Sequence, residues 1–127
     1  MERIPFGLSL LVLLTVLCGC MSHHPAPQTV IDRIGPGDST EQVRQTLVAA
    51  GFRYTGTVEH GEFQYRTRNP DGTSGTGHLS GVTFLEFDRR DSDHPLGLVY
   101  TSHRIAVVLD ERGEVVDVKH HYDMTGV

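Results

Sequence analysis

The clearest local signal in the sequence is a helix over residues 40–50, within the stretch DSTEQVRQTLVAAGF. Ser39 can cap its N-terminus, and Gln42, three residues later, completes a capping box in which each side chain binds the other residue's backbone N–H. Gly51 suits the position just after the helix, because glycine adopts the left-handed conformation without strain. The apolar residues at helical spacing are Val43, Leu47 and Ala50. The helix therefore has one apolar face that must pack against another element.

The chain after this helix alternates between apolar and polar residues, which is typical of β-strands with one buried face. The predicted strands lie at residues 52–55, 62–68, 82–89, 98–109 and 114–122. The predicted turns and loops between them lie at residues 59–61, 69–77, 91–95 and 110–113. Each connection is short enough to join antiparallel neighbours. The pattern predicts an α+β fold, with one N-terminal helix packed on an antiparallel β-meander of four to five strands.

Residues 1–20 (MERIPFGLSLLVLLTVLCGC) have the pattern of a secretion signal. The apolar run from Leu8 to Leu17 is shorter than the roughly 20 residues that a membrane-spanning helix needs. A buried core helix is the alternative, but such a helix has polar residues at helical spacing, and this run has almost none. We therefore expect a signal peptide over residues 1–19.

Both cysteines of the chain lie in the segment Leu17-Cys18-Gly19-Cys20. A bacterial lipoprotein signal has an apolar residue, then a small residue directly before the cysteine that receives lipid, and Cys20 meets this pattern. Cys18 is the rival acceptor, but it follows the bulky Leu17. Cleavage before Cys20 removes Cys18, so no thiol chemistry remains in the mature chain. Acyl chains such as palmitate on Cys20 would then anchor the protein, because several chains together bind a membrane far more firmly than one.

The residues after Cys20 predict where the protein resides and where its domain begins. In the known sorting pattern of lipoproteins, an Asp directly after the lipidated cysteine favours the inner membrane, so Met21 favours the outer membrane. Residues 20–30 contain prolines, histidines and small polar residues, which is typical of a flexible tether. We therefore expect a lipidated cysteine and tether over residues 20–30 and a periplasmic domain over residues 31–127.

Charge narrows the class of partner. The chain of 127 residues has a formal net charge of -5, with scattered arginines and Lys119 as its lysine. Nucleic-acid binding needs clustered Lys and Arg that neutralise phosphates. We therefore expect no nucleic-acid partner.

The eight histidines raise the possibility of a metal site. His78, His94 and a neighbouring Asp are one candidate set, whereas His120 and His121 are adjacent and would point to opposite faces of a strand. The mature chain has no thiolate and no HExxH or His-x-His spacing that would favour zinc. Surface histidines are therefore the preferred interpretation, and no metal or cofactor is predicted.

Two further segments contain residue types that occur in binding or catalytic sites. Asp88, Asp91 and Asp93 surround a loop, but they lack the ligand spacing and the glycine of a calcium loop. The glycine-rich stretch 72–81 contains serines but matches no nucleotide-binding or nucleophile motif. Because no nucleophile is paired with a base, we expect a protein that is not an enzyme and has no small-molecule substrate.

Two segments resemble the small outer-membrane lipoproteins of the BamE-like (SmpA/OmlA) family. Residues 34–43 (IGPGDSTEQV) are similar to the glycine, the helix-capping residue and the Glu-Gln-Val helix opening of that family. Residues 104–116 (RIAVVLDERGEVV) resemble its closing hairpin, in which a glycine turn joins two strands. The resemblance covers residues 31–122 and implies a BamE-like α+β periplasmic domain. It transfers no partner-binding residue to this chain.

Three functions follow as hypotheses. The preferred one is a lipid-anchored periplasmic interaction or scaffold lipoprotein of the outer membrane, which serves outer-membrane protein assembly or envelope maintenance. It would bind an envelope protein through the sheet face or through residues 69–81. The second is a periplasmic inhibitor that binds a hydrolase through a loop. Helix-plus-meander units also occur in β-lactamase-inhibitor-like domains. The third is a metal-binding lipoprotein that uses the histidines.

Overall fold

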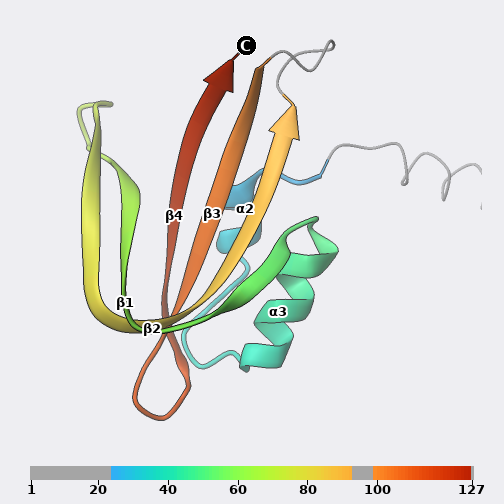
Figure 1. The fold of residues 1–127 in the computed structure, drawn as a ribbon, viewed down its shortest axis with the longest axis vertical. Coiled ribbons are helices and arrows are strands. Elements are labelled where there is room, and N and C mark those ends of the chain that lie inside the picture. The colour runs from blue at the N-terminus through green and yellow to red at the C-terminus, as the bar shows by residue number, and fades with distance from the viewer. Residues whose placement is uncertain (1–23, 93–98, 127) are drawn as a thin grey trace, which may run out of the picture.

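The computed structural model describes residues 24–92 and 99–126, and Figure 1 shows their arrangement. Within these residues, the helices α2 (Pro27–Ile31) and α3 (Thr40–Ala49) precede four strands. The strands are β1 (Arg53–Arg68), β2 (Ser74–Ser92), β3 (Val99–Leu109) and β4 (Val115–Gly126). They form one antiparallel sheet in the order β1-β2-β3-β4. The α+β class is confirmed as a small helix and a four-stranded antiparallel sheet. The predicted signal peptide and Cys20 lie outside the described residues.

Local hydrogen bonds and backbone conformation define the ends of α3. The Ser39 Oγ accepts a hydrogen bond from the Gln42 backbone N–H at 3.1 Å, which satisfies one of the N–H groups that a helix start leaves unpaired. Gly51 follows the helix with φ +90°, a conformation that costs glycine little. The helix expected over residues 40–50 is therefore present, one residue shorter at its end.

One face of the sheet packs against both helices. The helices contribute Val30, Val43 and Leu47 to this core, all almost completely buried. The sheet contributes Leu85, Phe87, Ile105, Val107 and Val115. Successive side chains of a strand alternate between faces. Ile105 and Val107 therefore face the helices, whereas Ala106 and Val108 lie on the other face. We call the first face the helix face.

The outer half of the β1–β2 hairpin folds back over the other face of the sheet, on the side away from α3 (Figure 1). We call this outer half, residues 63–79, the arm. Its bend coincides with shifts in the β1–β2 register on either side of Gly61, and such bulges bend a strand and increase its twist. A second buried cluster lies under the arm and consists of Phe63, Phe84, Ala106 and Val108. The single sheet therefore has a packed core on each face.

Tyr65 holds the arm against β4. Its ring covers Gly77, the directly opposite residue on β2. The Nζ of Lys119 on β4 lies 4.6 Å from the centroid of the same ring, within the range of a cation–π contact. A side chain at position 77 would overlap the ring, so glycine at this position lets Tyr65 lie across the hairpin.

β2 and β4 extend to Ser92 and Gly126, beyond their predicted ends, and three further segments differ from the sequence-based expectations. The predicted loop over residues 69–77 is wrong in length: β2 begins at Ser74, because Gly75 and Gly77 still pair with β1 and are covered by its side chains. The predicted turn at residues 59–61 is a bulged bend within a continuous β1. Residues 27–31, inside or next to the predicted tether, form α2, which starts with a proline and buries Val30 completely. The packed part of the chain therefore begins before residue 31.

Candidate functional site

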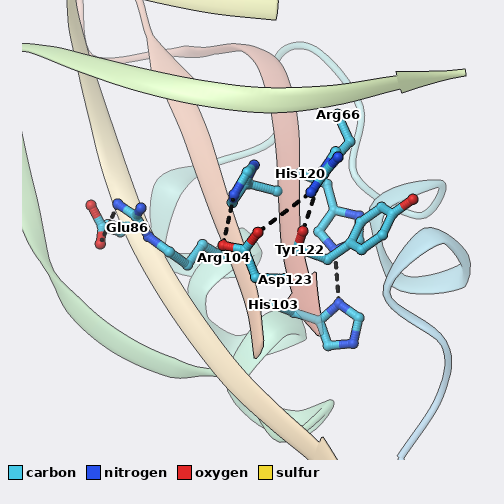
Figure 2. A network of polar contacts seen from close by, with 8 residues as sticks. Arg66, Glu86, His103, Arg104, His120, Tyr122 and Asp123 are labelled. Atoms are coloured by element: carbon cyan, nitrogen blue, oxygen red, sulfur yellow. Dashed lines mark hydrogen bonds and ion pairs between the residues drawn. The ribbon is translucent and has the colours of Figure 1, made fainter. Parts of the chain in front are cut away.

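His103 on β3 and His120 on β4 form a hydrogen-bonded pair on the helix face (Figure 2). His103 Nδ1 lies 3.0 Å from His120 Nε2, and the two rings stack with centroids 5.2 Å apart and an interplanar angle of 22°. His103 is directly opposite Tyr122, and His120 is directly opposite Ile105, so the histidines are diagonal neighbours across the strand pair. One nitrogen must donate and the other accept, so this contact needs at least one ring to be neutral.

An aspartate of β2 contacts His103, and an arginine of the same strand contacts that aspartate. Asp91 Oδ2 lies 3.3 Å from His103 Nε2 and 2.8 Å from Nη2 of Arg89. The Arg89 side chain is 4% exposed, and it donates to the backbone oxygen of Ala50 at 2.8 Å. A basic side chain at this place satisfies a carbonyl group that the end of a helix leaves unpaired. These contacts link the histidine pair to the C-terminal end of α3.

Arg66 crosses from the arm to β4 near the histidine pair (Figure 2). Its Nε donates to the backbone oxygen of Tyr122 at 3.3 Å, and its Nη2 lies 3.4 Å from Asp123 Oδ1. The guanidinium carbon lies 5.1 Å from the centroid of the Tyr122 ring, which is 5.7 Å from the centroid of the His120 ring. β1 and β4 are not neighbours in the sheet order. Side chains therefore close this gap, which we call the seam: residues 63–68 of the arm against residues 119–124 of β4.

The environment of His120 disfavours its charged form. Burial lowers the pKa of His120 from 6.5 to about 4, and the nearby positive groups of His103, His121 and Arg89 add to this effect. At neutral pH the His120 ring is therefore uncharged, with one N–H to donate and one nitrogen to accept. This state is compatible with the hydrogen bond to His103.

The tip of the arm is an exposed turn of residues 69–73 that is held by its own hydrogen bonds. The Asn69 N–H donates to the Thr73 backbone oxygen at 2.8 Å. Asp71 Oδ1 accepts from both the N–H and the hydroxyl of Thr73, at 3.0 and 2.6 Å. These bonds lower the pKa of the Asp71 carboxyl group. The shape of the tip is therefore set by the turn itself.

The sequence-based metal candidates are not brought together in the described part of the chain. His78 is exposed, with its Nε2 3.9 Å from Glu62, and His94 lies outside the described residues. Across residues 24–92 and 99–126, no group of three or more His, Cys, Asp or Glu side chains is placed to hold a metal ion. His120 and His121 do point to opposite faces, as expected, and His121 Nε2 lies 3.0 Å from Asp123.

The aspartates considered as a calcium loop have other partners. Asp88 accepts from Arg53 at 2.9 and 3.1 Å, and Asp91 contacts Arg89 and His103. Asp93 lies outside the described residues. The two described aspartates therefore serve ion pairs within the sheet.

The histidine pair has no local signal in the sequence. His103 and His120 are 17 residues apart and fall on separate predicted strands. They become neighbours only through the register of the β3–β4 hairpin. The sequence can place the two histidines close together only if residues are counted along both strands from the predicted turn at residues 110–113.

The chain shows no significant similarity to known proteins: no family model matches it, and neither curated proteins nor solved structures give a match. The resemblance to BamE-like lipoproteins therefore stays a prediction. Within residues 24–92 and 99–126, the structure has no helix with the length and apolar character to cross a membrane.

Proposed function

We propose that this chain is a lipid-anchored, non-catalytic interaction lipoprotein of the outer membrane, with its domain in the periplasm. It would bind an envelope protein through the tip of the arm, residues 69–73, and act as a scaffold in outer-membrane protein assembly or envelope maintenance. Acyl chains on Cys20 would hold it at the membrane. The proposal combines the lipoprotein signal and the family resemblance in the sequence with the form of the arm.

The single observation that carries the proposal is the exposed and internally bonded turn at the tip. All five residues from Asn69 to Thr73 are exposed, and the turn is fixed by hydrogen bonds between Asn69, Asp71 and Thr73. A binding loop that already has its bound shape loses less conformational freedom on association, so more of the contact energy remains as affinity. An exposed turn at the end of a long hairpin is also free to reach a surface or a cleft of another protein.

Site-specific crosslinking in cells tests this proposal. A photoreactive amino acid replaces Pro70 at the tip of the arm, and a matched variant carries it at Arg112, in the exposed turn between β3 and β4 at the other end of the molecule (Figure 1). We expect Pro70 to crosslink to an envelope protein and Arg112 not to do so. Equal crosslinking from both positions, or none from Pro70, contradicts the proposal.

The same experiment distinguishes the inhibitor hypothesis, which the internally hydrogen-bonded tip also supports. Inhibitor loops are fixed in shape before they enter an enzyme, for the same entropic reason. Crosslinking of Pro70 to a single periplasmic hydrolase, whose activity falls when the purified chain is added, assigns the chain as an inhibitor. Crosslinking to proteins of the β-barrel assembly machinery assigns it as a scaffold.

A further inference from the structure

A cavity of about 500 Å³ opens at the seam, where the arm, α2 and β4 meet. Arg66 and Arg68 line it from β1, and His120 and Tyr122 line it from β4. Gln28 of α2, Thr67 of β1 and Ser74 at the start of β2 also line it. The cavity therefore collects donors from both β1 and β4, which are the two edges of the sheet and share no backbone ladder.

The charge of this cavity is opposite to that of the chain. Its lining includes two arginines and no aspartate or glutamate, although the formal net charge of the chain is -5. Arg66 meets Asp123 only at 3.4 Å. Arg68 is exposed, and in the described residues it has no acidic side chain within ion-pair distance. At least one guanidinium group is therefore available to an anion.

The neutral groups of the wall are suited to the remaining oxygens of such an anion. Gln28 uses one amide N–H for Asp32 at 2.8 Å, so its other N–H stays available. Tyr122 and Ser74 each carry a hydroxyl group, which donates or accepts as needed. Guanidinium groups bind carboxylate and phosphate oxygens in pairs, and such charge-assisted hydrogen bonds are about twice as strong as neutral ones.

We propose that the seam cavity binds the phosphate or carboxylate group of a small soluble ligand, with Arg66 and Arg68 as its charged contacts. The cavity borders the protein contact proposed for residues 69–73, since Gly72 lines both, but its charged contacts Arg66 and Arg68 lie outside those residues. The ligand would connect the arm to β4 and α2. Because it binds the closed arrangement, it stabilises the seam by mass action.

Thermal melting and hydrogen exchange of the purified, processed protein test this inference. The probes are inorganic phosphate and citrate, each compared with sodium chloride at the same ionic strength. We expect a saturable rise in melting temperature with phosphate or citrate and slower exchange in residues 63–68 and 119–124. A response to phosphate alone assigns a phosphate ligand, and a response to citrate alone assigns a carboxylate ligand.

Two variants and a matched control decide whether the arginines are responsible. We expect Arg68→Gln to weaken the apparent affinity at least about tenfold, since a lost charge-assisted bond has an effect of this order. Arg66→Gln should do the same, but it also removes contacts that hold the arm, so Arg68→Gln is the decisive variant. Arg112→Gln removes an exposed guanidinium group from the far hairpin turn and should leave the response unchanged.

Three results would overturn the inference. The first is that sodium chloride raises the melting temperature as much as phosphate and citrate do, which would mean general screening of charge. The second is that phosphate and citrate raise the melting temperature of Arg68→Gln as they do that of Arg112→Gln, which would mean that the ion binds elsewhere. The third is that neither soluble anion changes the melting temperature of the wild type, whereas Arg68→Gln weakens binding to phosphatidylcholine vesicles that contain an anionic phospholipid. This result would mean that the arginines contact a membrane.

Discussion

His103 Nδ1 lies 3.0 Å from His120 Nε2, across two antiparallel strands. On one side of the pair, Asp91 joins His103 to Arg89 and so to the end of α3. On the other side, the rings of His120 and Tyr122 are neighbours, and the backbone oxygen of Tyr122 accepts from Arg66 of the arm. The pair therefore lies between the contacts at the end of α3 and the contacts of the seam.

Stability should fall in mild acid because of His120. The pKa of His120 is about 4 in the folded chain against 6.5 ordinarily, so between these values the unfolded chain binds more protons. The contribution of His120 to the free energy of unfolding is therefore fully present above pH 6.5, and it is lost as the pH drops from 6.5 towards 4. Each pKa unit corresponds to about 1.4 kcal/mol of unfolding free energy. Because the His120 ring is partly exposed, solvent screening reduces the expected loss to on the order of 1–2 kcal/mol.

Urea unfolding at several pH values, with the wild type beside His120→Asn, measures this contribution. The variant should show a smaller loss of unfolding free energy between pH 6.5 and pH 4, because it has no such proton to bind. His78→Asn is the control and should keep the wild-type slope, because this exposed histidine lies 3.9 Å from Glu62 and is not among the groups that lower the pKa of His120. Equal slopes for the wild type and His120→Asn would show that another group controls the acid response.

Leu47→Ala should destabilise the domain by about 2–5 kcal/mol, the usual cost of this substitution in a packed core. The Leu47 side chain lies in the core between α3 and the sheet and is 0% exposed. Val48→Ala, one position further along the same helix, is the control, because Val48 is 51% exposed and should change stability by less than about 0.5 kcal/mol. Denaturant midpoints compare the two, and similar losses for both variants would mean that α3 does not dock as described.

Gly77→Ala should loosen the arm, because a methyl group at position 77 would overlap the Tyr65 ring, which also contacts Lys119. We expect a loss of about 1–3 kcal/mol, as for other overpacked sites. Hydrogen exchange should rise in residues 63–68. Gly35→Ala is the control, since nothing lies within 4 Å of a side chain added there. An unchanged melting temperature and unchanged exchange in Gly77→Ala would contradict the contact between Tyr65 and the hairpin.

Cys20→Ser should release the protein from membranes, because the predicted acyl chains can then no longer be attached. Metabolic labelling with a palmitate analogue, followed by membrane fractionation, measures both effects. Cys18→Ser is the matched control, and it should keep labelling and anchoring, since Cys18 is expected to leave with residues 1–19. Continued labelling of Cys20→Ser would move the lipid acceptor to Cys18.

Local features of the sequence predict the elements and part of the site. Ser39, Gln42 and Gly51 are enough to place α3, because a helix cap depends on residues three or four positions apart. The opposite directions of His120 and His121 follow from the alternation of a strand. The extent of β2 is not predictable in this way, since the glycines at 75 and 77 favour a loop until Thr67 and Tyr65 cover them.

The sequence by itself determined the class of the fold, the position of α3 and the alternating strands, because these depend on periodicity and on neighbours along the chain. Only the tertiary structure decided that the arm folds back, that Arg66 reaches Tyr122, and that His103 meets His120. These contacts depend on where β1 bends and on the register between strands. Both are set by packing between residues far apart in the sequence, which local patterns do not encode.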